Sequence, residues 1–160
     1  MNKKEKLLKA ARNNLKMRFF MLKKLPLAFI AGLRVIHIDE KKAAVSIPYK
    51  FLNQNPFQSI YFAALAMAAE LSTGILAITS VQTASKPVSM LVFEMSANFT
   101  KKAKGKIVFS CNDGKAIEEA IEESVKTGEG QIVTATSIGI DSEGDQVAEF
   151  KFTWTFKPKA

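Results

Sequence analysis

The stretch of residues 55–74, NPFQSIYFAALAMAAELSTG, restricts the fold of this chain more than any other part of the sequence. It is almost entirely apolar and rich in alanine, so it predicts a buried helix that a β-sheet can approach closely. The apolar run continues past residue 74, but polar residues lie in the middle of that window and amphipathic strands flank it, which argues against a membrane span. We therefore expect a core helix that carries one carboxylate, Glu70.

Two positions fit the start of this helix. Asn55 is a good cap with Pro56 in the first turn, and Ser59 is an equally good cap after a turn through residues 55–58. In the second case the amides of residues 60–62 are first-turn donors without partners inside the helix. We expect the helix to end near residue 73, with Gly74 as its C-cap.

Alternating apolar and polar residues predict strands on both sides of the helix. In the last of these strands, alternate residues from Ala148 to Phe156 share one apolar face. A short acidic helix, for which Asp113 is the expected N-cap, separates two of the later strands. The expected strands are residues 33–38, 43–49, 86–100, 107–111, 131–140 and 147–156.

Strands linked by hairpins, together with one apolar helix, are the plan of the hotdog fold, an α+β fold in which an antiparallel sheet wraps around one long central helix. The length of 160 residues suits a single domain. We expect the hotdog domain to span residues 27–160, preceded by a basic amphipathic helix at residues 1–26.

Residues 1–24 carry nine Lys/Arg and one acid, so this arm holds the whole net charge of +8 and the rest of the chain is balanced. A balanced body argues against nucleic-acid binding. Two interpretations of the arm stay open: it docks on its own domain, or it rests on an anionic membrane surface or an acidic partner. Its apolar residues recur at helical spacing until Pro26 ends the run, namely Leu8, Ala11, Leu15, Phe19 and Leu22.

The chain has one cysteine and one histidine. With Cys111 alone no intramolecular disulfide can form, which points to a reducing, cytoplasmic location. Cys111 and His37 are too few ligands for a structural zinc site, and we expect no metal. Cys111 is expected to be a small strand residue rather than a nucleophile, because no histidine lies near it in the sequence.

Glu70 has two interpretations. As a structural residue, it pairs with a buried Lys or Arg or lies at the helix edge facing water. As a functional residue, it acts as a general base or nucleophile with a tunable pKa. At the start of the same helix, the amides of Tyr61 and Phe62 would suit a developing oxyanion. Glu70 lies eight residues beyond Phe62, or about 12 Å along the axis, so one helix cannot bring both groups to one carbonyl. Two antiparallel copies can, and catalysis by Glu70 therefore predicts at least a dimer.

These residues resemble the hotdog-fold acyl-CoA thioesterases, the group that includes the 4-hydroxybenzoyl-CoA and phenylacetate-pathway enzymes. In those families an Asn precedes the central helix, a His-Gly-Gly-like turn opens it, and an Asp or Glu lies eight residues after the first Gly. Here Asn55 matches the Asn and Glu70 falls on the acid. Tyr61-Phe62-Ala63 stands in place of the turn, so Phe62 replaces a glycine.

The resemblance also extends to the strands after the helix. Ser89 in KPVSMLVFE matches a strand hydroxyl of the family. Lysines in a turn such as KKAKGK are usually just solvated. The turn also resembles the one that lies near the nucleotide end of coenzyme A, which makes Lys101, Lys102 and Lys104 candidate phosphate ligands. Asn55 and Ser89 would then position the acyl group or the attacking water.

The resemblance implies a homodimer, or a dimer of dimers, that hydrolyses an acyl-CoA or acyl-carrier thioester. It implies no metal or redox cofactor, with coenzyme A present only as part of the substrate. Acyl carrier protein dehydratases of the same fold pair a His with a helix Glu, but His37 lies on an early strand and is expected to be a strand histidine. The alternative is a non-catalytic acyl- or lipid-binding hotdog protein that the basic arm holds at a membrane.

Overall fold

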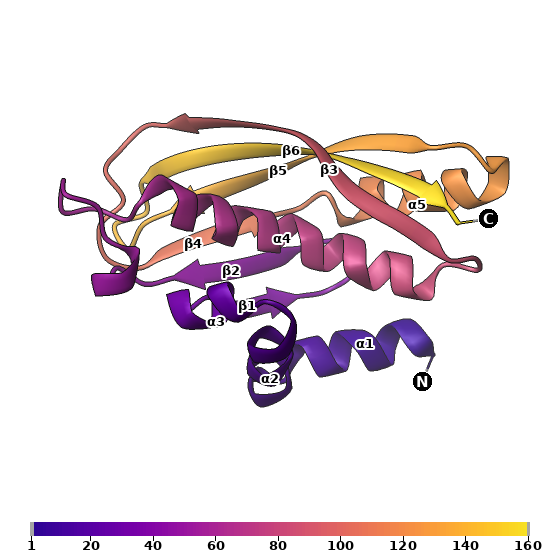
Figure 1. The fold of residues 1–160 in the computed structure, drawn as a ribbon, viewed down its shortest axis with the longest axis horizontal. Coiled ribbons are helices and arrows are strands. Elements are labelled where there is room, and N and C mark those ends of the chain that lie inside the picture. Colours follow the sequence, from indigo (N-terminus) through magenta and orange to yellow (C-terminus); the bar gives the residue numbers. More distant parts are fainter. Residues whose placement is uncertain (1, 160) are drawn as a thin grey trace.

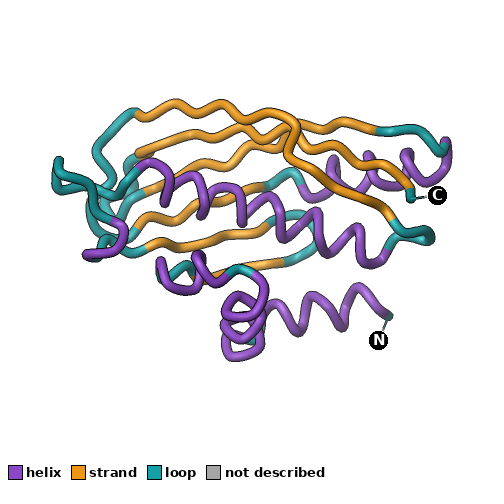
Figure 2. Tube along the Cα trace, viewed as in Figure 1, coloured by secondary structure: helices purple, strands orange, loops and turns teal. Residues whose placement is uncertain are grey.

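The computed structural model describes residues 2–159 of the chain. A long helix, α4, lies across a curved antiparallel sheet, while α1 to α3 lie along one edge of the molecule (Figure 1). Figure 2 shows the same arrangement coloured by secondary structure, with the long helix drawn across the strands. In chain order the elements are α1 (Lys3–Arg12), α2 (Asn14–Lys24), α3 (Pro26–Ala31), β1 (Arg34–Ile38), β2 (Ala43–Ile47), a 3-10 turn (Phe51–Asn53), α4 (Phe62–Thr83), β3 (Val88–Phe99), β4 (Ile107–Cys111), α5 (Gly114–Thr127), β5 (Gln131–Ile140) and β6 (Gln146–Pro158).

The six strands within the described residues form one antiparallel sheet in the order β1-β2-β4-β5-β6-β3. β1 and β3 are therefore the two edges. The concave side of the sheet packs against α4, which contacts β2, β4, β5, β6 and β3. This is the predicted hotdog architecture, and each predicted strand is present with small differences at its ends.

The face of β6 that contacts α4 is the one predicted from its alternation. Its alternate residues from Ala148 to Phe156 are all buried. Opposite them, Ala68, Ala69 and Ala77 of α4 are fully buried, and their small side chains let the sheet come close to the helix backbone. The alanine content of the central segment thus has the structural role expected from the sequence.

Both predicted ends of the central helix are wrong. The helix begins at Phe62, and Tyr61 is its N-cap without a side-chain cap, because neither Asn55 nor Ser59 immediately precedes helical backbone. It continues to Thr83, so Gly74 lies in its interior rather than at its C-terminus. By length and hydropathy α4 would suit a membrane span, but 67% of its most apolar window is buried inside the protein, as in a core helix.

The N-terminal arm consists of three helices instead of one. Asn13 ends α1 and caps α2, with its side chain accepting a hydrogen bond from the amide of Lys16. Pro26 begins α3. The break at Asn13 rotates the buried face of α2, so the predicted single stripe holds in α1 and is wrong in α2. Leu8, Ala11, Met17 and Met21 are buried, whereas Leu15, Phe19 and Leu22 are 79%, 57% and 49% exposed.

Asp113 precedes α5 as predicted, but its side chain does not cap the helix. Its carboxylate accepts a hydrogen bond from the amide of Thr136 on β5 at 2.7 Å. This contact fixes the start of α5 against the sheet.

Candidate active site

Glu70 lines an apolar pocket, here called the Glu70 pocket, of about 590 Å³ between α3, α4 and β3. Apart from Glu70, Tyr61 and Asn53, all the lining residues are apolar. They are Leu27, Ile30, Ala31, Leu52, Ala63, Ala64, Ala66, Met67, Val92, Met95 and Phe152. A pocket with this lining suits a hydrocarbon or aromatic group that carries one reactive polar function near the carboxylate.

The Glu70 side chain is half-buried and sits over Gly74, one turn further along α4. A Cβ at position 74 would lie 2.9 Å from Oε1 of Glu70, so the glycine provides the space for the carboxylate. Among the residues that the structure describes, none donates a hydrogen bond to this carboxylate and no cation pairs with it. Burial therefore raises the pKa of the Glu70 carboxyl.

The helix turn that carries Glu70 is tied to the sheet. Nε1 of Trp154 on β6 donates to Oγ1 of Thr73 at 3.0 Å. The same hydroxyl donates to the backbone carbonyl of Glu70, also at 3.0 Å. These two linked hydrogen bonds fix the backbone from which the Glu70 side chain projects.

A second pocket of about 630 Å³, here called the helix-start pocket, surrounds the beginning of α4. It brings together five of the residues predicted from the sequence: Asn55, Tyr61, Phe62, Lys101 and Lys102. Tyr61 lines both pockets, whereas Glu70 lies only in the other one. Ala63 also lines the Glu70 pocket, whereas Phe62 lines only the helix-start pocket. Glu70 and Phe62 of one chain thus lie in different pockets, in line with their spacing of eight residues along the helix.

The backbone amides at the helix start correct one predicted role. The amide of Tyr61 donates to the carbonyl of Asn53 at 2.7 Å, and that of Ile60 donates to the carbonyl of Ala103 at 2.8 Å. Tyr61 is therefore not an oxyanion donor. In residues 2–159 the amides of Phe62 and Ala63 have no backbone acceptor, so the free donors begin one residue later than predicted.

The ring of Phe62 lies toward the helix-start pocket. It makes edge-to-face contacts with Tyr61 and Phe99, with ring centroids at 5.0 Å and 6.4 Å. Phe62 lines the helix-start pocket and not the Glu70 pocket. A side chain at this position in place of glycine therefore leaves the space around Glu70 of its own chain unobstructed.

Asn55 is half-buried and shapes the turn before the helix. Its Oδ1 accepts from the amide of Phe57 at 2.9 Å, and its Nδ2 donates to Oγ of Ser59 at 3.0 Å. Sequence reasoning missed the neighbouring Asn53, which is buried and lines the Glu70 pocket. Its Nδ2 donates to the carbonyls of Ala31 and Pro48, both at 2.8 Å, so it joins α3 to the end of β2. The only sign of this role in the sequence is that the segment FLNQN contains two asparagines, Asn53 and Asn55.

Ser89 lies outside both pockets. It is exposed near the start of β3, and its hydroxyl donates to the carbonyl of Lys157 at 3.1 Å on the neighbouring strand. Within one chain, the structure therefore does not bring Ser89 to Glu70 or to the helix start.

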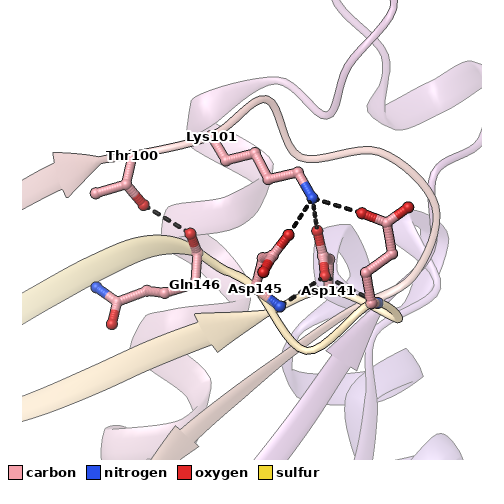
Figure 3. Close-up of polar contacts among 6 residues, drawn as sticks. Thr100, Lys101, Asp141, Asp145 and Gln146 are labelled. Carbon is pink, nitrogen blue, oxygen red and sulfur yellow. Dashed lines mark hydrogen bonds and ion pairs between the residues drawn. The ribbon is translucent and has the colours of Figure 1, made fainter.

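Lys101 is held by three carboxylates of the β5–β6 turn (Figure 3). Its Nζ lies 2.8 Å from Asp141, 2.7 Å from Glu143 and 2.7 Å from Asp145. These bonds, that of Asp141 foremost, raise the pKa of Lys101. In this structure the Lys101 ammonium is therefore engaged with carboxylates, and its predicted role as a phosphate ligand would require that it leave them. Lys102 remains in the helix-start pocket, and Lys104 is exposed outside it.

His37 and Cys111 lie away from the two pockets. Nε2 of His37 contacts Oδ2 of Asp39 at 2.9 Å on the exposed side of β1, as expected for a strand histidine. Cys111 is fully buried in β4, and burial raises the pKa of its thiol to about 12. A thiol with this pKa stays protonated, so Cys111 is not an activated nucleophile.

Solved structures similar to this chain have the same fold. A protein of unknown function from Pseudomonas aeruginosa, described as a probable thioesterase, is 23% identical with a TM-score of 0.78, over 92% of this chain and 97% of that one. A thioesterase from Haemophilus influenzae is 11% identical with a TM-score of 0.67, over 91% of each chain. The PaaI protein of the phenylacetic acid degradation operon of E. coli is 13% identical with a TM-score of 0.62, over 96% of each chain.

These similarities confirm that the chain has the hotdog fold predicted from its sequence. Among curated proteins none matches it. A family model described as Domain of unknown function (DUF4442) matches residues 14–156, from the first residue of α2 to near the end of β6. Since the match covers the sheet, the central helix and both pockets, the chain belongs to the DUF4442 family.

Proposed function

We propose that this protein hydrolyses an acyl thioester, with Glu70 as the general base or the nucleophile. The observation that carries the proposal is the carboxylate itself: it is half-buried, has a raised pKa and faces an apolar pocket of about 590 Å³. A carboxylate that loses solvation without gaining a partner costs folding free energy, which favours a functional explanation. The thioesterase relatives of the same fold support this reaction class.

The acting unit in this proposal is a dimer. Glu70 and the free amides of Phe62 and Ala63 lie about 12 Å apart along one helix, too far for one carbonyl to reach both. β3 pairs only with β6 and forms an open edge. Along this edge Leu91, Phe93 and Phe99 are 66%, 65% and 51% exposed. A second copy that covers β3 would bring its own helix start toward Glu70.

In the dimer the chemistry proceeds by a balanced hydrolysis. The Glu70 carboxylate takes a proton from a water molecule, and the water oxygen bonds to the thioester carbonyl carbon. The resulting oxyanion accepts hydrogen bonds from the amides of Phe62 and Ala63 of the other chain. The C–S bond then breaks, the sulfur takes the proton from Glu70, and a carboxylic acid and a free thiol leave. Direct attack by Glu70 would give a mixed anhydride that water opens to the same products.

Release of free thiol from a panel of acyl-CoAs tests this proposal. Wild type should turn over at least one of them, and Glu70→Gln should lower the rate by about 10²- to 10⁴-fold, the usual contribution of a general base. Glu129→Gln, a change of the same kind on an exposed turn, is the matched control. No turnover by wild type, or a full rate in Glu70→Gln, would contradict the catalytic role of Glu70.

A second candidate, a non-catalytic acyl-binding protein, follows from Phe62. The hotdog-fold acyl-CoA thioesterases that the sequence resembles have glycine at this position of the turn, where a thioester approaches the backbone closely. Under this alternative, calorimetry would detect binding of acyl-CoA to wild type, and the thiol assay would detect no hydrolysis. The two experiments together separate the candidates.

A further inference from the structure

The outer face of α2 carries three exposed apolar side chains at helical spacing. Leu15, Phe19 and Leu22 lie at positions i, i+4 and i+7, so they project from the same side of the helix. The opposite side of α2, with Met17 and Met21, is buried in the protein core. α2 is thus firmly placed and presents an apolar stripe to the outside, unlike scattered surface leucines that need no explanation.

Positive charge surrounds this stripe. Residues 6–38 contain eight Lys/Arg and no Asp or Glu, and four of these cations belong to α2. The Nζ of Lys23 lies 4.5 Å from the ring centroid of Phe19, and the guanidinium carbon of Arg18 lies 5.3 Å from that of Phe29. In residues 2–159 no carboxylate lies within 4 Å of the α2 cations. An apolar stripe with an uncompensated cationic rim complements an anionic bilayer, whereas nucleic acid or an acidic peptide needs only the charge.

The same surface continues to the Glu70 pocket. α3 follows α2 after a single residue and packs against it (Figure 1). Leu27 and Ile30 of α3 are 68% and 53% exposed, and both line the Glu70 pocket. The rim of the pocket is therefore joined directly to the basic, apolar face of α2.

We propose that the outer face of α2 docks this protein on an anionic membrane surface, with Leu15, Phe19 and Leu22 in the lipid interface and Lys16, Arg18, Lys23 and Lys24 at the headgroups. This docking brings the α3 rim of the Glu70 pocket next to the bilayer. An acyl chain that partitions into the membrane then has a short apolar route to the pocket. The substrate class is thus long-chain acyl thioesters; this last step rests on the proposed hydrolase function, whereas the docking does not.

Co-sedimentation with phosphatidylcholine vesicles, with and without phosphatidylserine, tests the docking. Wild type should bind the anionic vesicles and lose binding as salt rises, while neutral vesicles bind weakly. Lys23→Gln/Lys24→Gln should lower affinity about 30-fold, since each cation near an anionic surface contributes roughly a factor of five. Lys115→Gln/Lys126→Gln on α5 makes the same change in net charge at exposed positions and should bind as wild type does.

The apolar stripe is tested separately with Phe19→Ser/Leu22→Ser, whose side chains are exposed, so the fold is retained. This variant should lose vesicle binding, whereas Ile132→Ser, a change at a 62% exposed position on β5, should not. The proposal would be overturned if Phe19→Ser/Leu22→Ser bound anionic vesicles as tightly as wild type does. It would also be overturned if wild type bound neutral and anionic vesicles equally well. A change of solution mass in Phe19→Ser/Leu22→Ser would instead assign this face to a second copy of the chain.

Hydrolysis on vesicles tests the delivery step. The Phe19→Ser/Leu22→Ser variant should hydrolyse a short, water-soluble acyl-CoA at the wild-type rate and a vesicle-bound long-chain acyl-CoA several-fold more slowly. Equal rates on both would contradict delivery from the membrane. Vesicle binding without any hydrolysis would contradict the proposed function and leave the membrane docking intact. Hydrolysis without vesicle binding would contradict the docking and leave the proposed function intact.

Discussion

At the scale of single residues, the site depends on a glycine in the interior of a helix. Glycine at such a position costs about 0.5–1 kcal/mol relative to alanine. Gly74 nevertheless lies where a Cβ would meet Oε1 of Glu70 at 2.9 Å. The glycine gives up helix stability and leaves space for a carboxylate, which is the pattern expected where function outweighs stability.

Gly74→Ala should therefore separate stability from activity. The end of the flexible Glu70 side chain can move away from the new methyl group, so the melting temperature should stay equal or rise. Displacement of the carboxylate by about 1 Å should lower thiol release by about 10²-fold. Gly130→Ala, where the nearest atom would be 4.0 Å from the added Cβ, is the matched control. Full activity in Gly74→Ala would show that the position of the carboxylate does not matter.

The protonation of Glu70 predicts how rate and stability depend on pH. Burial raises its pKa above the ordinary 4.5, so the folded protein holds this proton more tightly than the unfolded chain does. The stability that this proton contributes is fully present below pH 4.5 and is lost as pH rises through the raised pKa. The base form gains population over the same range, so the rate should rise with pH while stability falls.

Melting curves of wild type and Glu70→Gln check the stability part. The neutral amide should be the more stable protein near pH 7, and the difference should vanish below about pH 4.5. A pH-rate profile with its acid limb at or below pH 4.5 would contradict the raised pKa. A constant difference in melting temperature at all pH values would show that packing, rather than ionisation, distinguishes the two proteins.

At the scale of elements, β3 is the least protected part of the sheet. It is a 12-residue edge strand that pairs with β6 only, and it bulges between Val92 and Glu94. Long, apolar edge strands tend to pair with another chain. Its exposed apolar residues therefore support the second copy that the proposed active site requires.

Leu91→Lys/Phe93→Lys should convert the proposed dimer to a folded monomer. Like charges placed opposite one another at the shared edge oppose association, and both side chains are exposed in the single chain. Light scattering should give the mass of one chain, circular dichroism should be unchanged, and thiol release should fall below detection. Ile132→Lys on the interior strand β5 should keep the wild-type mass. A wild type that is itself monomeric would exclude the shared site.

Local patterns predicted the elements, and contacts distant in sequence decided the details of the site. The period of two placed the strands, and the alanine-rich run placed the core helix. The amide of Tyr61 could not be predicted as occupied, because its acceptor is the carbonyl of Asn53 in a separate 3-10 turn. Lys101 forms ion pairs with carboxylates that are 40 to 44 residues further along the chain. Such pairings leave no periodic signal.

At the scale of the whole molecule, the arm and the hotdog domain share one core. Met21 is 1% exposed, and Leu8 and Ala11 belong to the same hydrophobic cluster as the residues of α4 and the sheet. α1 packs against both α4 and β1. The basic helices are thus part of the folded body, which fixes the orientation of the α2 face relative to the Glu70 pocket. A loosely tethered arm would bind a membrane without orienting the pocket.

This integration predicts that a cavity in α2 destabilises the whole protein. Met21→Ala should lower the free energy of unfolding by about 2–5 kcal/mol, because it removes a buried side chain. Phe19→Ala, two residues away in the same helix but 57% exposed, should change it by no more than about 0.5 kcal/mol. The single Trp154 lies between β6 and α4, so its fluorescence during urea unfolding reports the core rather than the arm. If the arm unfolds independently, Met21→Ala will leave the Trp154 transition in place, and the α2 face would not hold a fixed orientation relative to the Glu70 pocket.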